Sequence, residues 1–364
     1  MQTAQHIREQ FNDQRANGKR AKDAAEALGL GEGAAVAAHL GEHEFAPKAV
    51  LLRKDWLELL KSLEACGPLL ALTRNESTVH EKTGVYTNLS ASGHIGMALG
   101  EAIDLRLFFD RWHAGFAVKE LAANPQNRPN WSLQFFDASG KAVHKIFTRD
   151  ATAMVAWEAV IDRFTADTQI APEFVAPTPK KEPKPDSQLD AAALSAAWAN
   201  MKDTHEFFKL LNIHEAERQQ SFRLVEGRFT QRLARDALRE LLLGASFDGT
   251  PIMCFVSSGG CIQIHSGPVK RIEPMEIHGT AWLNVIDPGF NLHLREDSIA
   301  QVWLVEKPTS DGVVTSVEAF DHEGDLMAMF FGARKPGKPE LQAWRDIAHA
   351  LPKSSTTELI AELA

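Results

Sequence analysis

Two stretches of the sequence decide the fold: residues 132–147, SLQFFDASGKAVHKIF, and residues 316–331, SVEAFDHEGDLMAMFF. In register, the two stretches share a serine, two phenylalanines, an aspartate and a glycine. Each runs from one apolar segment through a short Asp…Gly turn into a second apolar segment, which is typical of a β-hairpin. The sequence therefore predicts the same hairpin in each half of the chain.

Other segments repeat in the same order around these hairpins. The matched pairs are Ala156-Trp157 with Ala343-Trp344, residues 103–120 with residues 290–307, and SASGHI (90–95) with SSGGCI (257–262). Matches that keep one order indicate a duplicated unit. In each unit, strand-like segments group together and do not alternate with helices. We therefore expect an α+β fold of two tandem repeats, each a large antiparallel β-sheet flanked by α-helices.

A proline-rich segment separates the two repeats. Residues 172–185, PEFVAPTPKKEPKP, carry five prolines. Proline interrupts helices and interior strands and favours an extended spacer. We therefore predict an N-terminal repeat at residues 1–168, a linker at residues 169–188 and a C-terminal repeat at residues 189–364.

Composition excludes several classes of protein. With 364 residues, 44% of them hydrophobic and 24% charged, the chain has the composition of a globular protein of two domains. The net charge of −9 argues against a nucleic-acid partner. Residues 19–30, KRAKDAAEALGL, resemble half of a helix-turn-helix, but no second basic helix accompanies them.

The cysteines and the apolar segments argue against cysteine-ligated metal sites and against membrane insertion. Cys66, Cys254 and Cys261 form no CxxC pair, so a zinc ribbon, an iron–sulfur centre or a covalently attached haem lacks its ligands. The first residues contain no apolar leader, and no run of 18 apolar residues occurs. We therefore expect a cytoplasmic protein that does not insert into a membrane.

The segment after the linker places a histidine in an apolar pattern. Leu194, Trp198, Met201, His205 and Phe208 recur at spacings of 4, 3, 4 and 3, which predicts one apolar helix face. Burying an imidazole without a partner costs roughly 1–3 kcal/mol, so a partner is expected. That partner is either a backbone carbonyl, which is the commoner case, or an iron atom.

A second helix is expected directly after this one. Asn212 and Glu215 form a candidate capping box, which would place Arg218 in the second turn of the new helix. In that position Arg218 would face a cleft beside the first helix. The alternative is a solvated surface arginine, which is the usual environment of a helical arginine.

Segments spread over roughly residues 5–352 resemble the family of haemin-utilisation proteins of the HemS, ChuS and HmuS type. The matching segments are THEFFKLL (204–211), HEAERQQSF (214–222), RNESTVHEKTGVYTN (74–88), AIDLRLFFDRW (102–112), GGCIQIHSG (259–267), WLNVIDPGFNLHLREDSIAQVW (282–303) and KPTSDGVVTS (307–316). The resemblance covers both repeats and the linker between them.

The resemblance implies a haem site in a cleft next to the C-terminal repeat. His205 matches the axial ligand to the haem iron, and Arg218 matches an arginine that works on the opposite side of the iron. Arg218 is therefore also the candidate catalytic residue. Arg106 is implied to contact the haem, and Lys307 and Arg334 to approach its propionates. The expected cofactor is haem b, bound without a covalent link, with Trp198, Met201 and Phe208 helping to form its apolar wall.

The sequence departs from the family pattern near the haem edge. Val313 and Phe331 stand where many relatives carry tyrosine, and Tyr86 is the single tyrosine of the chain. These changes affect the expected propionate contacts more than the expected iron ligand. His80 matches a recurring histidine of the N-terminal repeat, which is either a second haem site or a histidine bonded within its own sheet.

The resemblance implies a role in haem uptake and iron acquisition. One function is degradation of haem to release iron, with electrons from an external donor because the sequence has no GxGxxG fingerprint. The alternative is a carrier that takes haem from an ABC importer and passes it to a separate haem oxygenase. An interaction module without a cofactor is the third class that the repeats alone allow.

Overall fold

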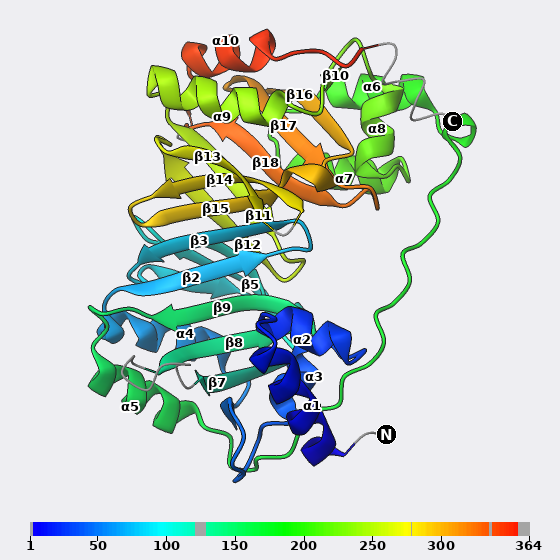
Figure 1. Cartoon of the computed structure of the whole chain (residues 1–364). Coiled ribbons are helices and arrows are strands. Elements are labelled where there is room, and N and C mark those ends of the chain that lie inside the picture. Colours follow the sequence, from blue (N-terminus) through cyan, green and yellow to red (C-terminus); the bar gives the residue numbers. More distant parts are fainter. Residues whose placement is uncertain (1–2, 121–128, 278, 335–336, 356–364) are drawn as a thin grey trace. The chain divides into compact units, whose positions relative to one another are not determined.

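The computed structural model describes residues 3–120, 129–277, 279–334 and 337–355 (Figure 1). The chain forms two compact units that exchange short segments. Unit 1 comprises Met1–Arg74, His80–Thr178 and Ser257–Gln263, and unit 2 comprises Asn75–Val79, Pro179–Val256 and Ile264–Ala364. Unit 2 thus begins at Pro179, within the segment predicted as a linker. The last residues of the predicted C-terminal repeat, 356–364, lie outside the described residues.

Unit 1 combines helices with antiparallel strands. Its helices are α1 (Ala4–Ala16), α2 (Ala21–Ala27), α3 (Glu32–Ala37), α4 (Trp56–Ser62) and α5 (Met154–Phe164), and its strands are β1 (Lys48–Leu51), β2 (Leu69–Arg74), β4 (Leu89–Ser92), β5 (Ile95–Leu99), β6 (Asp104–Phe108), β7 (Ala114–Glu120), β8 (Asn130–Phe136) and β9 (Ala142–Thr148). The antiparallel ladders run β1-β7-β8-β9-β2 and β4-β5-β6. β3 (Thr78–Gly84) and β12 (Cys261–Gly267) contain residues of both units.

The larger ladder of unit 1 is covered by helices on both faces. Ala117 of β7 belongs to the core formed with α4 and α5. Its neighbours Phe116 and Val118 point to the opposite face, where they pack with α3 and with Phe174 of the proline-rich segment. This alternation follows from the two-residue period of a β-strand.

Unit 2 has the same composition of elements. Its helices are α6 (Ala191–Ala199), α7 (Glu206–Ile213), α8 (Arg218–Leu224), α9 (Ala237–Asp248) and α10 (Gln342–Ala350), and its strands are β10 (Thr230–Leu233), β11 (Ile252–Ser257), β13 (Ile272–Ile277), β14 (Thr280–Asp287), β15 (Phe290–Arg295), β16 (Gln301–Thr309), β17 (Gly312–Phe320) and β18 (Leu326–Gly332). Its antiparallel ladders run β10-β16-β17-β18-β11 and β13-β14-β15.

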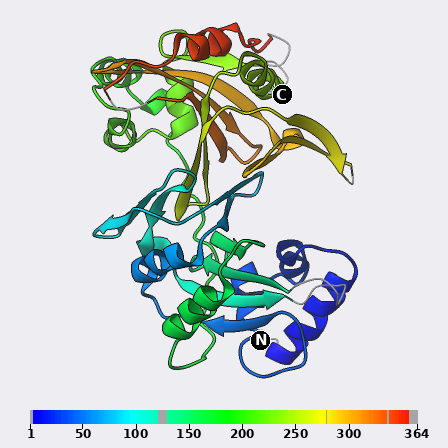
Figure 2. The ribbon, with the colours of Figure 1, turned by 90° about the vertical axis from the view of Figure 1, so that its left-hand side faces the viewer.

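The larger ladder of unit 2 also has two covered faces. Val302 and Leu304 of β16 pack with α9 and α10, whereas Trp303 and Val305 pack with α6, α7 and α8. Figures 1 and 2 show α9 and α10 side by side over one face of this ladder. The face that carries α6, α7 and α8 is the one that positions the candidate site.

The two hairpins predicted from the sequence are confirmed. β8 pairs with β9 from Ser132↔Phe147 onward, and β17 pairs with β18 from Ser316↔Phe331 onward. Each hairpin also carries a register shift at its turn end, between Phe135 and Phe136 in unit 1 and at the equivalent place in β17. A shared β-bulge is a conserved feature of a duplicated hairpin. The predicted α+β fold of two repeats with antiparallel sheets is therefore confirmed.

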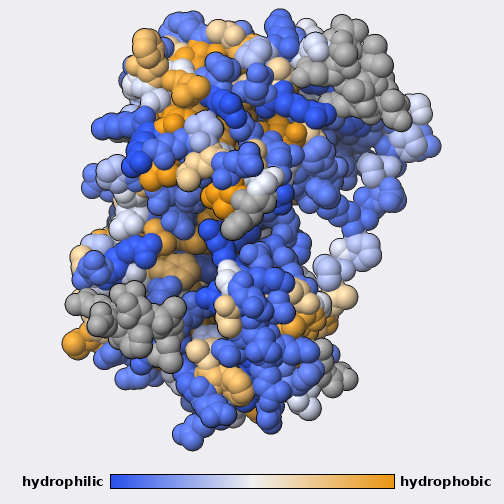
Figure 3. Space-filling view, viewed as in Figure 1, coloured by the Kyte–Doolittle hydropathy of each residue, from blue (hydrophilic) through white to orange (hydrophobic). Residues whose placement is uncertain are grey.

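The proline-rich segment 172–185 has no helix or strand and is largely exposed. Among the described residues, no helix is both long and apolar enough to cross a membrane. On the face of the molecule that Figure 3 shows, hydrophobic residues form small groups among hydrophilic ones.

The prediction of one continuous helix through His205 is wrong. α6 ends at Ala199, α7 begins at Glu206, and His205 is the N-cap residue between them. The Asp203 carboxylate accepts the backbone N–H of His205 at 2.8 Å, and such local bonds compete with helix formation. As a result Trp198 is buried, while Phe208 is 73% exposed and does not lie on the same face.

The prediction of a capping box at Asn212 is also wrong. α7 continues to Ile213, and the capping box that starts α8 is formed by Glu217 and Gln220. Arg218 is consequently the first residue of α8 and does not lie in its second turn.

Candidate functional site

Four partly buried apolar side chains form a surface on one face of the unit 2 ladder. β11 and β18 place Met253 opposite Phe331, and Phe255 opposite Met329. The rings of Phe255 and Phe331 lie 5.1 Å apart, and all four side chains keep intermediate exposure. We call these four residues the apolar face. Their neighbours along β11 and β18 point the other way, into the core with α9 and α10.

A buried charged cluster lies beside the apolar face, centred on Glu318 of β17. Its carboxylate accepts hydrogen bonds from Arg218 Nε at 2.6 Å and from Arg218 Nη2 at 2.9 Å. It also accepts hydrogen bonds from Lys307 Nζ at 3.1 Å and from Ser316 Oγ at 2.9 Å. Glu318 is opposite Met329 in the ladder, so the cluster and the apolar face share one side of the sheet.

The charges of this cluster depend on one another. Burial raises the pKa of Glu318, but the charges of Arg218 and Lys307 and the hydrogen bonds from Arg218 and Ser316 outweigh burial and lower that pKa to about 2. Burial lowers the pKa of Lys307 to about 8, against the opposing charge of Glu318. At pH 7 the cluster therefore holds two cations and one carboxylate, with one positive charge in excess.

Aromatic rings and a thioether surround the cations. The Arg218 guanidinium lies 5.2 Å from the ring centre of Phe207 and 5.8 Å from that of Phe222, and Lys307 Nζ lies 4.6 Å from that of Phe207. Such cation–π contacts stabilise charges that have lost water. Arg218 Nη2 also lies 3.2 Å from Met329 Sδ, which joins the cluster to the apolar face.

His205 lies at the start of α7, two residues before Phe207, and its side chain is 93% exposed. Its Nδ1 lies 2.6 Å from Asp203 Oδ1. The backbone and side-chain hydrogen bonds of His205 lower the pKa of Asp203, and the charge of Arg334 adds to this effect. Nε2 of His205 has no hydrogen-bond partner among the residues that the structure describes. A carboxylate on one ring nitrogen and a free second nitrogen is the usual arrangement of a metal-ligating histidine.

The structure brings together some of the residues named from the sequence. Arg218 and Lys307 both form ion pairs with the carboxylate of Glu318. The charge of Arg334 lowers the pKa of Asp203, whose carboxylate contacts His205. Arg106 belongs to unit 1, where it lies on β6 and forms an ion pair with Asp104.

Several of these side chains differ from expectation in exposure. Lys307 was expected to approach the propionates but is only 3% exposed, because its ammonium is bound inside the cluster. Trp198 and Met201, expected in the apolar wall, are buried in the core of α6, α7 and α8. Phe208 is exposed.

Sequence reasoning missed the carboxylates that hold the predicted residues. Glu318 stands between Val317 and Ala319 in a strand-like segment. A charged residue at such a position was a signal that a basic side chain is buried next to it. Asp203 stands two residues before His205, directly before the matching segment 204–211, and was not assigned a role.

Three other histidines, His144, His80 and His265, are buried. In unit 1, the ring of His144 forms two hydrogen bonds, from Nε2 to Tyr86 Oη at 2.8 Å and from Nδ1 to Thr73 Oγ1 at 2.9 Å, with donor and acceptor set by the tautomer. Burial lowers the pKa of His144 to about 3. His80 is fully buried, so its ring presents no surface to a haem in this structure. His265 stacks on Phe290 with ring centres 3.7 Å apart.

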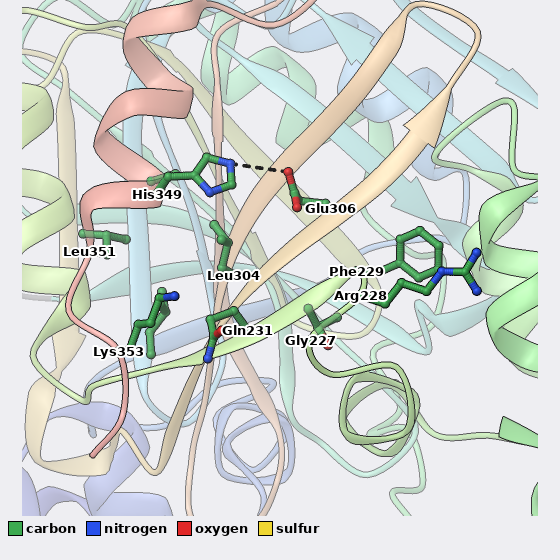
Figure 4. Close-up of a pocket in the computed structure, with 12 residues that line it drawn as sticks. Gly227, Arg228, Phe229, Gln231, Leu304, Glu306, His349, Leu351 and Lys353 are labelled. Carbon is green, nitrogen blue, oxygen red and sulfur yellow. Dashed lines mark ion pairs between the residues drawn. The ribbon is translucent and has the colours of Figure 1, made fainter. Parts of the chain in front are cut away.

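A separate pocket of about 200 Å³ lies in unit 2 between β10, β16 and the end of α10 (Figure 4). His349 points from α10 toward Glu306, with 3.4 Å between Nε2 and Oε1. None of the residues that line this pocket belongs to the charged cluster or to the apolar face.

Comparison with known proteins shows which family the chain matches. The HemS family, described as a haemin-degrading HemS.ChuX domain, matches residues 29–164 and again residues 215–351. The hemin transport protein HmuS of Yersinia pestis is 36% identical over 338 residues, which cover 90% of this chain and 92% of that protein. The hemin transport protein HemS of Yersinia enterocolitica is 37% identical over 352 residues, covering 93% and 95%.

Solved structures agree with these matches. Holo-PhuS, a heme-binding protein from Pseudomonas aeruginosa, has a TM-score of 0.91 and 42% identity, and the match covers 97% of this chain and 100% of that chain. ChuS, described as an E. coli heme oxygenase, has a TM-score of 0.83 and 35% identity, and the match covers 95% and 99%. The chain belongs to the HemS family of haemin-degrading HemS.ChuX-domain proteins.

Proposed function

We propose that the protein binds haem b without a covalent link at the apolar face of unit 2 and degrades it to release iron. Haem is a flat apolar disc with two carboxylates at one edge, so its site needs an apolar surface and nearby cations. Met253, Phe255, Met329 and Phe331 supply the surface. Arg218, Lys307 and Arg334 supply the cations, and the excess positive charge of the cluster complements the carboxylates.

The observation that carries this proposal is the state of His205. Its imidazole is exposed, Asp203 holds Nδ1, and Nε2 is left for a ligand. A neutral imidazole is a common proximal ligand of haem iron. Phe208, three residues after His205, is 73% exposed and would be covered by haem bound to His205.

Burial of the disc is expected to dominate the affinity. Covering a few hundred Å² of apolar surface at about 25 cal/mol per Å² gives several kcal/mol of gross driving force. Exposed cation–carboxylate contacts add roughly 0.2–1 kcal/mol each. The cations therefore orient the disc more than they hold it.

For degradation, the protein supplies position and charge. Bound haem supplies the iron and the ring that is oxidised, and the electrons come from an external donor. Arg218 is the candidate catalytic residue because its guanidinium is a permanent cation with several N–H donors.

We place the protein in the cytoplasm, in haem uptake and iron acquisition, without a nucleic-acid partner. An ABC importer would deliver the haem. The alternative is a carrier that passes intact haem to a separate haem oxygenase. The names of the relatives contain both roles, because HmuS is called a hemin transport protein and ChuS a heme oxygenase.

The first experiment is a haemin titration of the wild type and of His205→Ala. His205 makes no side-chain capping bond to α7, so its removal leaves the helix intact. We expect a Soret band in the wild type and at least 100-fold weaker binding in H205A. His214→Ala, which removes a histidine at the other end of α7, is the matched control and should bind as the wild type does. Equal binding by H205A and the wild type would refute the axial role.

The second experiment separates the enzyme from the carrier. Ascorbate is added to the haem complex with catalase present, and the products are identified. Bleaching of the Soret band with release of iron supports degradation. Transfer of intact haem to apomyoglobin without bleaching supports the carrier.

A further inference from the structure

The charged cluster of unit 2 has a neutral counterpart in unit 1. In the duplicated hairpins, Glu318 corresponds to Gln134, and Ser316 corresponds to Ser132. Ser316 donates to Glu318 at 2.9 Å, and Gln134 donates to Ser132 at 3.0 Å. The same two strand positions therefore bond to each other in both units, but only unit 2 has a carboxylate there.

The first residue of the neighbouring helix is also different in the two units. α8 begins with Arg218, and α3 begins with Glu32. Each helix packs on the corresponding side of its ladder, α8 against β16 and α3 against β7. In unit 1, Glu32 forms a buried ion pair with Lys145, one anion to one cation. The excess positive charge is thus a property of unit 2.

The position of Met329 gives a second difference between the two units. β2 and β9 pair Leu72 with Lys145, where β11 and β18 pair Phe255 with Met329. Lys145 is buried in its ion pair with Glu32, whereas all four side chains of the apolar face are uncharged and partly exposed. An excess charge next to an open apolar surface points to an anionic apolar ligand in unit 2.

Glu318 determines how Arg218 can act there. Its two oxygens accept the fork of Nε and Nη2, which fixes the plane of the guanidinium. Nη1 has no hydrogen-bond partner among the described residues, so it remains available to a ligand. Glu318 also neutralises one of the two cations of the cluster.

We infer that Glu318 is the positioning residue of the haem site: it fixes the guanidinium of Arg218 and limits the charge that the bound iron experiences to one positive unit. This inference rests on the proposed function. Gln134, the neutral residue at the equivalent position of unit 1, does not have this role.

The first test needs no haem. The Arg218 Nε–H signal is identified by nuclear magnetic resonance of ¹⁵N-labelled protein, through its loss in Arg218→Lys. We expect slow exchange of this proton with water in the wild type and at least 10-fold faster exchange in Glu318→Gln. Exchange in the wild type as fast as that of exposed arginines would overturn the inference, whether or not haem binds.

The second test measures charge at the iron. Azide, an anion, and imidazole, a neutral ligand, are titrated into the ferric haem complex at pH 7. Lys307→Met leaves Arg218 and Glu318, a cluster without net charge, so azide should bind about 10-fold weaker than in the wild type. Adding Glu318→Gln to Lys307→Met leaves Arg218 alone, so one positive charge returns and azide should bind about 10-fold tighter than in K307M. Lys307 is absent from this comparison because Glu318 raises its pKa. Imidazole affinity should change less than twofold in both variants.

The control variant is Glu306→Gln. Glu306 is on β16, next to β17, and contacts two basic side chains, Arg345 and His349, but it lines the separate pocket. It should leave both affinities unchanged. Glutamine at position 318 is compatible with the hairpin because unit 1 carries it at the same place, and K307M tests the charge effect if E318Q does not fold.

The outcomes separate the two proposals. A loss of azide affinity in K307M that the added E318Q reverses, with constant imidazole affinity, supports the inference. Azide and imidazole affinities that change together, or do not change at all, reduce Glu318 to a structural residue and overturn it. Failure of the wild type to bind haemin overturns the proposed function instead, and the exchange measurement still decides whether Glu318 fixes Arg218.

Discussion

At the scale of single residues, carboxylates hold the side chains on which the candidate site depends. Asp203 holds the imidazole of His205, and Glu318 holds Arg218 and Lys307. The two carboxylates differ in environment, because Asp203 is exposed and Glu318 is fully buried. Loss of Asp203 should therefore affect the ligand site, whereas loss of Glu318 should also affect the stability of the fold.

Asp203→Asn should weaken haemin binding by about 10- to 100-fold, which is the usual effect of losing the carboxylate behind a ligating histidine. The measurement is a haemin titration followed at the Soret band. Asp190→Asn is the matched control, because Asp190 caps α6 and asparagine caps a helix equally well. Unchanged binding by D203N would show that Asp203 does not orient His205.

The buried Glu318 predicts a pH dependence of stability. Its folded pKa of about 2 lies below its ordinary value of 4.5, so its ionised form stabilises the fold above pH 4.5. This stabilisation is lost as the pH falls toward 2. The difference in unfolding free energy between the wild type and E318Q should therefore shrink over that range in urea titrations. A difference that stays constant from pH 7 to pH 3 would contradict the low pKa.

At the scale of elements, short helices place the functional side chains. α7 and α8 each span about two turns, and isolated helices of that length are unstable in water. They persist because Phe207 and Phe222 pack in the core with β16 and β17. The capping box of α8 adds to this by fixing the residue from which Arg218 extends.

Glu217→Ala removes the capping box and should lower the unfolding free energy by about 0.5–2 kcal/mol. Urea unfolding followed by circular dichroism measures this loss. The control is Glu215→Ala, whose exposed pair with Lys184 should contribute little. Equal stability of both variants would mean that packing alone holds α8.

At the scale of the whole molecule, the two units exchange segments. Residues 257–263 lie within the C-terminal half of the chain but belong to unit 1, and residues 75–79 belong to unit 2. The exchanged Gly260 carbonyl accepts hydrogen bonds from the Phe108 backbone at 3.0 Å and from Trp112 Nε1 at 2.9 Å. Cys261 is fully buried in the same core.

Residues 1–178 and 179–364, produced as separate chains, should therefore each fold poorly, because each lacks a segment of its own unit. Thermal unfolding of each piece should show no cooperative transition, while the two pieces produced together should recover one. The intact chain is the reference for both measurements. A cooperative transition in either piece alone would show that the exchanged segment is dispensable.

The sequence by itself determined the duplication, the hairpins and the family. These depend on local patterns, such as the Asp…Gly turns of residues 132–147 and 316–331, which require no knowledge of distant contacts. It also identified His205, Arg218 and Lys307 through matching segments, and Arg334 through the resemblance to the family; the roles of these residues in haem binding stay predictions.

Only the tertiary structure decided how these residues are held. The helix break before His205 depends on a hydrogen bond to Asp203 that competes with the apolar pattern. The burial of Lys307 depends on Glu318, which lies on the neighbouring strand, because a buried cation requires a nearby anion. Spacing along the chain does not encode such pairings between strands, so the charge of the site could be read only from the folded molecule.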